Sequence, residues 1–140
     1  MGPIWDYNLA FGNADFCGGG DTDVWAFELN DRCPNQDYLV PFWWERLLED
    51  ANFVSQLQDR WGFLRLDVLS NESINEQIDS YTTLLNEAGA VENNFNKWDV
   101  LGQYVPPNNF IGDSHSEEID YLKSWIDDRL VWLDSAINEL

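Results

Sequence analysis

The sequence predicts a mainly α-helical (α+β) fold, in which a short β-containing segment precedes a longer helical part. Two patterns indicate this: apolar residues alternate with polar ones near the N-terminus, and they recur every three or four residues from position 42 onward. The 140 residues fit one domain or one lobe of a larger domain. Eight Trp, eight Phe and five Tyr supply enough apolar material for a core. We therefore predict a strand and loop segment over residues 1–40 and helices over residues 41–140.

The N-terminal segment is predicted to contain two short strands. Residues 5–11 alternate large apolar side chains with small or polar ones, which is the pattern of a half-buried strand. Residues 12–13 (Gly-Asn) then predict a turn, and the three glycines of residues 18–20 predict a loop. Residues 24–29 form a second short run that a polar pair ends. The alternative for the whole segment is an irregular loop.

Cys17 and Cys33 are the only two cysteines of the chain. Their spacing is not that of a CxxC redox pair, and two cysteines need further ligands to form a zinc site, whereas the single histidine, His115, lies far along the chain. The glycine-rich polar stretch between them is typical of a loop that a disulfide closes, which would stabilise the fold by roughly 3 kcal/mol. We predict a disulfide and an oxidising compartment. The alternative is two buried thiols in a cytosolic protein.

The first helical stretch covers residues 42–64, whose apolar side chains form one stripe at three- and four-residue steps. Pro41 stands at its first position, where the missing N–H of proline has no cost. Residues 50–52 can divide this stretch into two helices.

A second helix is predicted from about Asn71 to Ala88, with a capping box at 73–76 and Ser70 or Asn71 as alternative caps. Gly89 weakens or ends it, and a short helical piece over residues 95–98 follows.

The last helix is the clearest predicted element. Residues 99–113 precede it as a loop, because residues 106–109 (Pro-Pro-Asn-Asn) are poorly compatible with a helix. The helix opens at Ser114, and acidic residues crowd its first turn, where the helix dipole favours them. Apolar residues between 119 and 137 then form one stripe.

The charge balance is strongly acidic, with 26 Asp and Glu against 7 Lys and Arg and a formal net charge of -19. Such a surface repels phosphate backbones and anionic lipid, so nucleic-acid binding and anionic membranes are disfavoured. Cations, basic peptides and metal–nucleotide complexes remain as partners. The alternative is that the acidic residues only keep an aromatic-rich protein in solution. No apolar stretch approaches the roughly 20 residues of a membrane helix, and no targeting signal is visible.

Asp6 and Asn8 are the candidate metal ligands. Strand alternation would place both side chains on one side of the segment, flanked by aromatic residues. A carboxylate beside an amide oxygen offers hard ligands suited to Mg²⁺ that carries nucleotide phosphates. The alternative is a solvated strand face without a ligand.

The same segment resembles a known family. Residues 5–12 (WDYNLAFG) are similar to the W-D-(aromatic)-(D/N)-(L/M)-A-F-G segment of CotH-type proteins, atypical protein kinases named for a spore-coat component. Further stretches resemble the exported branch of that family, so that the resemblance spans nearly the whole chain; they are residues 13–19, 30–34, 40–50, 98–104 and 118–123.

The resemblance implies a kinase-like fold, of which this chain would be the latter half of the helical C-lobe. Family members transfer the γ-phosphate of ATP to Ser or Thr of secreted or coat proteins, which implies an extracellular or cell-surface location. By resemblance, Asp6 would hold Mg²⁺ against the phosphates, like the metal-binding Asp of the kinase DFG segment. Asn8 stands where some members have a second Asp.

The resemblance also implies that this chain holds only part of the active site. The family's phosphate-covering lobe, its nucleotide-positioning Lys and its catalytic Asp precede the W-D segment. We therefore expect a C-terminal fragment with no catalytic residue of its own, inactive alone, which binds Mg²⁺ and ATP only with the upstream half.

The alternative function is a non-catalytic helical module that binds carbohydrate or protein at a cell surface. Trp43 and Trp44 could stack on a sugar, although helical spacing predicts that at least one of them lies in the core. Two further features have ordinary explanations. Asp15, Asp21 and Asp23 could hold Ca²⁺ but are more simply a solvated turn, and His115 is expected to be exposed rather than catalytic.

Overall fold

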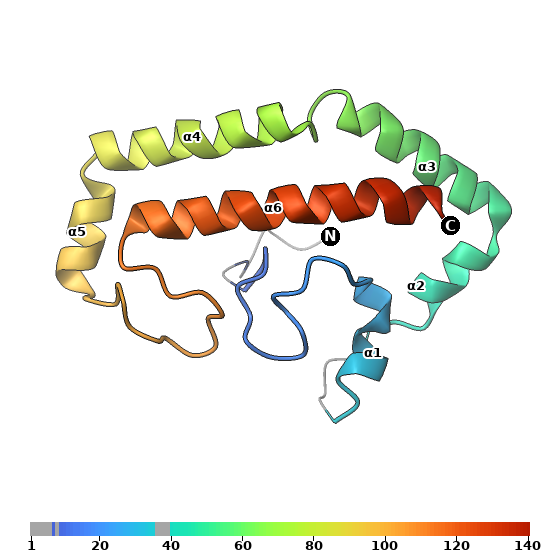
Figure 1. The fold of residues 1–140 in the computed structure, drawn as a ribbon, viewed down its shortest axis with the longest axis horizontal. Coiled ribbons are helices and arrows are strands. Elements are labelled where there is room, and N and C mark those ends of the chain that lie inside the picture. Colours follow the sequence, from blue (N-terminus) through green and yellow to red (C-terminus); the bar gives the residue numbers. More distant parts are fainter. Residues whose placement is uncertain (1–6, 8, 36–39) are drawn as a thin grey trace. The chain divides into compact units, whose positions relative to one another are not determined.

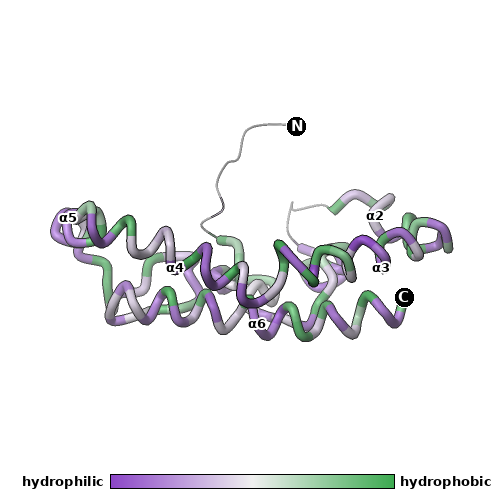
Figure 2. Tube along the Cα trace, turned by 90° about the horizontal axis from the view of Figure 1, so that it is seen from above, coloured by the Kyte–Doolittle hydropathy of each residue, from purple (hydrophilic) through white to green (hydrophobic). Residues whose placement is uncertain are grey.

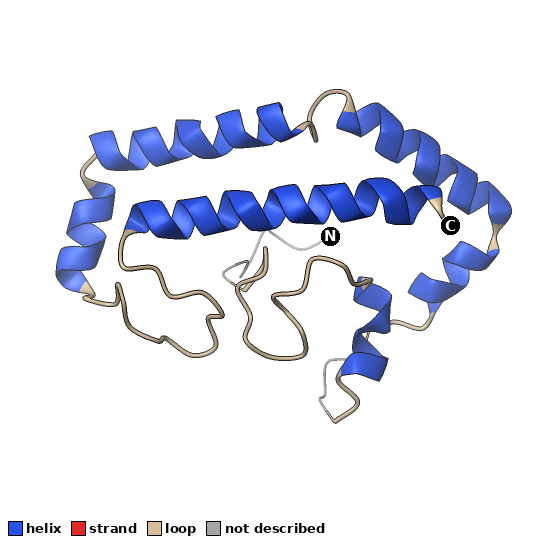
Figure 3. Cartoon of the chain, viewed as in Figure 1, coloured by secondary structure: helices blue, strands red, loops and turns tan. Residues whose placement is uncertain are grey.

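The computed structural model describes residues 7, 9–35 and 40–140, and this part of the chain is mainly α-helical, as predicted (Figure 1). The elements in chain order are η1 (Ala26–Glu28), α1 (Leu29–Arg32), α2 (Trp43–Arg46), η2 (Leu47–Glu49), α3 (Ala51–Arg65), α4 (Asn71–Glu87), α5 (Ala90–Lys97) and α6 (His115–Asn138). No strand occurs among the described residues (Figure 3). Within the same residues, none of the helices combines the length and the apolar character needed to cross a bilayer.

The chain divides into two compact units, each of which we describe by itself. The first unit comprises Met1–Asp21 and Gln77–Ile126, and the second comprises Thr22–Glu76 and Asp127–Leu140. Helices α4 and α6 therefore each contribute residues to both units.

The predicted division near residue 50 is present, and a side chain explains where α3 begins. Asp50 has extended backbone angles and accepts a hydrogen bond from the Asn52 N–H at 2.8 Å, which satisfies one of the free donors of the first turn. The start of α4 is capped by Ser70 rather than by a box at 73–76, because the Ser70 hydroxyl accepts from the Ser73 N–H at 3.1 Å.

The predicted end of α4 and start of α6 are confirmed. Gly89 adopts the left-handed conformation (φ 67°), which ends α4 and lets α5 begin at the next residue. At the other boundary, the Ser114 hydroxyl accepts from the Glu117 N–H at 3.2 Å, and two glutamates occupy the first turn of α6.

The strand predicted over residues 24–29 is wrong. Residues 26–28 form the short 3-10 helix η1, which leads directly into α1. The Arg129 guanidinium donates to the carbonyls of Thr22 and Val24 at 2.6 and 2.7 Å. A side chain of α6 thus supplies the hydrogen bonds that the N–H groups of a neighbouring strand would otherwise donate to these carbonyls. The Trp25 ring packs on Trp132 at 4.9 Å between centroids, and this tertiary contact overrides the period-2 pattern.

The strand predicted over residues 5–11 is also absent from the part of it that the structure describes. The backbone carbonyl of Tyr7 accepts a hydrogen bond from the Ala10 N–H at 3.0 Å, as in a turn, and Phe11 has a positive φ of 54°. The remaining members, residues 5, 6 and 8, lie outside the described residues.

Hydrophobic and hydrophilic residues alternate along α3, α4 and α6, the pattern of amphipathic helices (Figure 2). Among the described residues the buried apolar side chains are Ala14 and Ile126 in the first unit and Leu130 and Ile137 in the second. Many large apolar side chains remain exposed, and these include Phe42, Phe63, Leu66, Tyr81 and Leu84.

A polar network joins α3 to α6 within the second unit. The Asp134 carboxylate accepts from Trp61 Nε1 at 2.9 Å, from Arg65 Nε at 2.9 Å and from Arg65 Nη2 at 3.0 Å. A guanidinium that meets both carboxylate oxygens is a geometrically specific pair, so this network fixes the register of the two helices.

Candidate functional site

The two predicted metal ligands, Asp6 and Asn8, lie outside the described residues. Their neighbour Tyr7 and residues 9–21 are described, and they belong to the first unit. The candidate site is therefore built from the turn that follows Asn8 and from the part of α6 that the turn contacts.

The turn over residues 10–13 has an unusual backbone. The Asn13 N–H donates to the Ala10 carbonyl at 3.3 Å, and both central residues have positive φ, 54° at Phe11 and 80° at Gly12. The positive φ at position 12 favours glycine, and the space around it requires glycine as well, because a Cβ there would lie 2.2 Å from Nε1 of Trp125. The backbone at Gly12 thus packs against Trp125 of α6 with no room for a side chain.

Two side chains bind the carbonyl of Gly12. The Tyr121 hydroxyl donates to it at 2.9 Å, and Nδ2 of Asn109 donates at 3.2 Å. Tyr121 is itself fixed, because its ring stacks on Phe110 with the centroids 4.3 Å apart and the planes 2° from parallel. We call these two donors together with Trp125 the α6 clamp; the clamp holds the turn against the helix.

Trp125 extends the clamp to the loop that follows the turn. Its indole N–H donates to the Gly20 carbonyl at 2.8 Å, and its ring meets Phe11 edge-on at 6.2 Å. Tyr121 and Trp125 are four residues apart and so share one face of α6. One helix face therefore contacts both ends of the loop from Gly12 to Gly20.

The loop from 98 to 114 anchors the same segment at Asp15. The Asp15 N–H donates to the Pro107 carbonyl at 3.0 Å, and the Tyr104 hydroxyl donates to the Asp15 carboxylate. That hydrogen bond is the main reason why the pKa of Tyr104 is raised from its ordinary value, with smaller contributions from desolvation and the Asp15 charge.

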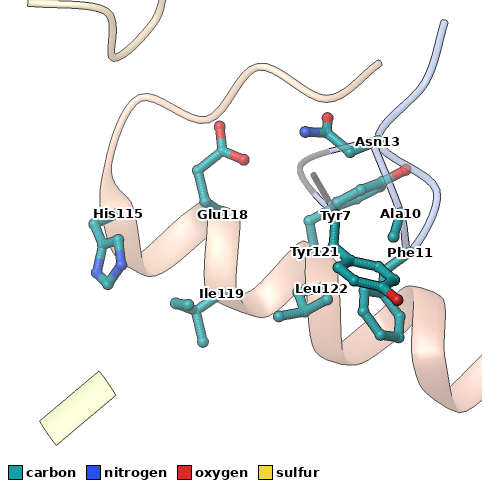
Figure 4. A pocket seen from close by; sticks show the side chains of 9 residues that line it. All are labelled: Tyr7, Ala10, Phe11, Asn13, His115, Glu118, Ile119, Tyr121 and Leu122. Carbon is teal, nitrogen blue, oxygen red and sulfur yellow. The ribbon is translucent and has the colours of Figure 1, made fainter. Parts of the chain in front are cut away.

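A pocket of about 290 Å³ opens beside the turn (Figure 4). Its lining residues come from the turn and from the first two turns of α6; they are Tyr7, Ala10, Phe11, Asn13, His115, Glu118, Ile119, Tyr121 and Leu122. The rings of Tyr7 and Phe11 lie near Leu122, whereas the Glu118 carboxylate and the His115 imidazole lie nearer the start of α6 (Figure 4). The Glu118 carboxylate accepts from the Gly112 N–H at 2.7 Å, which orients it. The pocket thus combines the aromatic ring of Tyr7, which stands between Asp6 and Asn8 in sequence, with the carboxylate of Glu118 on α6.

The comparison with protein families gives one result. A family model described as CotH kinase protein matches residues 1–133 of the 140. The chain belongs to the CotH kinase protein family. None of the curated proteins or solved structures matches it. The match covers both the turn and the α6 clamp, so the described site lies within the region that defines this CotH chain as a family member.

The described residues of the CotH chain hold no metal cluster. No three His, Cys, Asp or Glu side chains within the described ranges are placed to bind one ion, and this includes Asp15, Asp21 and Asp23.

The other predicted features have clear positions. Cys17 and Cys33 are both disulfide-bonded, as predicted. His115 is half-buried rather than exposed, with its ring 6.2 Å from that of Phe95. Trp43 and Trp44 are 51% and 41% exposed, so the expectation that at least one belongs to the core is wrong.

Sequence reasoning did not identify the α6 clamp. Residues 118–123 were part of the resemblance, yet the role of Tyr121 follows from a contact with a residue 109 positions away. The available signal was the spacing of Tyr121 and Trp125, which are four positions apart on a predicted helix. This spacing alone indicates only that the two rings share one helix face.

Proposed function

We propose that this chain contributes the metal-holding part of a CotH-type protein kinase site, which transfers the γ-phosphate of ATP to Ser or Thr of secreted or surface proteins. Asp6 would hold Mg²⁺ against the phosphates, with Asn8 as a further oxygen ligand. The family match supports a kinase-related function, and the resemblance of residues 5–12 supports the role of Asp6.

The observation that carries the proposal is the α6 clamp. Phosphoryl transfer depends on positioning and on charge neutralisation more than on covalent chemistry by the protein. A metal-binding carboxylate must therefore be held on a fixed backbone. Gly12 stands six residues after Asp6, and two side chains donate hydrogen bonds to its carbonyl. Trp125 lies so close to Gly12 that a Cβ on this residue would overlap the indole. The backbone at Gly12 is thus held by side chains distant in sequence, which supports a positioning role for this segment.

The proposal gives this chain no catalytic base and no phosphate-binding lysine. A kinase site needs both, because the base accepts the substrate hydroxyl proton and the lysine orients the phosphates. By the resemblance, the upstream half of the domain supplies them. We therefore expect weak or no binding of Mg²⁺–ATP by the 140-residue chain and tight binding once the upstream half is joined to it.

The test is Mg²⁺–ATP binding by titration calorimetry on the chain joined to the upstream half of a CotH domain. Asp6→Asn should weaken binding at least about tenfold, since loss of even an outer partner of a metal site has that effect. Asp128→Asn is the matched control, because Asp128 is an exposed carboxylate on α6, and it should leave binding unchanged. Equal affinities of the Asp6→Asn protein and the parent would refute the metal role. Phosphate transfer by the 140-residue chain alone would refute the need for the upstream half.

A further inference from the structure

The pocket beside the turn has two chemically different ends, and the kinase proposal uses neither of them. At one end the rings of Tyr7 and Phe11 lie near Leu122, and we call it the aromatic end (Figure 4). At the other end lies the carboxylate of Glu118, and we call it the carboxylate end (Figure 4). Glu118 and Leu122 are four residues apart on α6, so they are about 6 Å apart along the helix axis. Every residue that lines this pocket belongs to the first unit.

The aromatic end presents ring surface to a ligand. Tyr7 and Phe11 are 63% and 51% exposed, so neither ring is covered by the rest of the first unit. The Phe11 ring is held in place, because it meets Trp125 edge-on with the centroids 6.2 Å apart. Aromatic rings pack favourably on other rings, with a gain beyond the burial of apolar area. This end therefore favours a ligand with an aromatic body.

The carboxylate end carries a negative charge that no cation offsets within the described residues. Oε1 of Glu118 accepts from the Gly112 N–H at 2.7 Å, and in the described part of the chain the carboxylate forms no ion pair, with His115 or with any other cation. The sequence of the first unit contains two lysines and no arginine, and Lys123 already pairs with Asp79 at 2.5 Å between Nζ and Oδ1. Oε2 of Glu118 is therefore left to accept from the cationic group of a ligand.

The electrostatics of the carboxylate end favour an organic cation over an anion or a metal ion. The positive end of the α6 dipole, roughly half an elementary charge, opposes a cation here. Glu117 and Glu118 both lie in the first turn, and their two negative charges outweigh it. The same carboxylates repel phosphate, so this pocket does not suit the phosphates of a nucleotide. A divalent metal ion needs several oxygen ligands, whereas the described lining residues include no second carboxylate.

We propose that the pocket beside the turn binds a small arylalkylamine, a ligand in which a short chain joins an aromatic ring to an ammonium group. The ring packs against the aromatic end, and the ammonium donates to Oε2 of Glu118. A two-carbon chain matches the separation of one helical turn between the two ends. The volume of about 290 Å³ lies at the lower limit for ligand pockets, roughly 300–1,000 Å³, which fits a ligand of this size. The proposal goes beyond the kinase function and uses neither Asp6 nor Asn8, so the two can fail separately.

The experiment titrates phenethylamine into the isotope-labelled 140-residue chain and follows its backbone amide signals by NMR. Salt at about 0.15 M screens general attraction of amines to a protein of net charge -19. Phenethylamine should bind saturably and shift the amide signals of Glu118 and Ile119. Three reference compounds each lack one feature: phenylethanol has the ring without the charge, phenylpropionate reverses the charge, and propylamine has the charge without the ring. Each of them should bind at least about fivefold more weakly, because it loses either the charged hydrogen bond or the ring contact.

Replacement of Glu118 tests the carboxylate end. Glu118→Gln keeps an amide oxygen that can accept from the Gly112 N–H but removes the charge, so it should weaken phenethylamine binding by on the order of tenfold. Glu117→Gln is the matched control. Glu117 lies in the same turn of α6 and also accepts from a backbone N–H, that of Asp113 at 2.9 Å, but it does not line the pocket. Glu117→Gln should therefore change the affinity by less than about twofold.

Replacement of Tyr7 tests the aromatic end. Tyr7→Leu should weaken phenethylamine binding about threefold or more, because it removes one ring contact. Tyr81→Leu is the matched control, since Tyr81 is 59% exposed on α4 and does not line the pocket, and it should leave the affinity unchanged.

Four outcomes would overturn the proposal. They are no saturable binding of phenethylamine, an equal affinity for any of the three reference compounds, equal affinities of the Glu118→Gln and Glu117→Gln proteins, and equal affinities of the Tyr7→Leu and Tyr81→Leu proteins. Helix content measured by circular dichroism shows whether each variant is folded. If Glu118→Gln is not folded, the reference compounds on the parent protein and the Tyr7→Leu protein give the decision.

Discussion

Replacing Gly12 with alanine should be one of the most damaging small changes in this chain. The backbone at Gly12 has φ 80°, a conformation that costs an L-residue about 1 kcal/mol. The added Cβ would also lie 2.2 Å from Nε1 of Trp125 and 2.3 Å from its Cδ1, far inside contact distance. Relief of that overlap by movement of the indole costs typically about 1–3 kcal/mol. The indole is held by its hydrogen bond to the Gly20 carbonyl, worth about 1 kcal/mol.

These contributions together predict that Gly12→Ala lowers the free energy of unfolding by about 3–5 kcal/mol. The assay is urea denaturation followed by circular dichroism at the helix band, with the midpoint and slope fitted for both proteins. Gly62→Ala is the matched control. Gly62 lies within α3, and a Cβ there would meet nothing within 4 Å, so it should stabilise the protein by roughly 0.5–1 kcal/mol. A Gly12→Ala protein within about 0.5 kcal/mol of the parent would show that the turn is not packed against α6 in this way.

Three further outcomes follow from the contacts. Tyr121→Phe removes one of the two donors to the turn carbonyl and should lower the free energy of unfolding by about 1 kcal/mol in the same urea assay; no change would mean that water replaces the hydroxyl. Burial raises the pKa of Asp134, but the hydrogen bonds from Arg65 and Trp61 and the Arg65 charge outweigh it and leave the pKa below its ordinary value of 3.8. Asp134 therefore stabilises the fold above pH 3.8, and this contribution is lost as the pH falls through the lowered folded value. Asp134→Asn should lower the thermal midpoint at pH 7 and flatten that acid loss, whereas a profile parallel to the parent's would contradict the assignment. Reduction of the disulfide between Cys17 and Cys33 should lower the free energy of unfolding by roughly 3 kcal/mol, measured with and without a reductant, and identical curves would contradict it.

The helices could be predicted from the sequence because their signals are local. The cap at Asp50, the left-handed Gly89 and the acidic first turn after Ser114 each lie within a few residues of the boundary they determine. The amphipathic stripes of the long helices follow from the same short-range periodicity.

The N-terminal segment could not be predicted in this way, because its backbone is held by residues distant in sequence. The carbonyl of Gly12 meets donors 97 and 109 positions later, and the carbonyls of Thr22 and Val24 meet Arg129 more than 100 positions later. A period-2 pattern indicates a strand only where another strand supplies the hydrogen bonds, and here side chains of α6 and the loop before it supply them instead.

The α6 clamp allows a separate test of how the proposed metal site is positioned. The clamp holds the turn at Gly12 through hydrogen bonds from Tyr121 and Asn109, and Trp125 binds the Gly20 carbonyl. If the clamp also positions Asp6, Tyr121→Phe should weaken Mg²⁺–ATP binding by the chain joined to the upstream half, because the outer partners of a metal site affect its affinity. A Tyr121→Phe protein that is less stable but binds Mg²⁺–ATP as tightly as the parent would show that the clamp serves the fold alone.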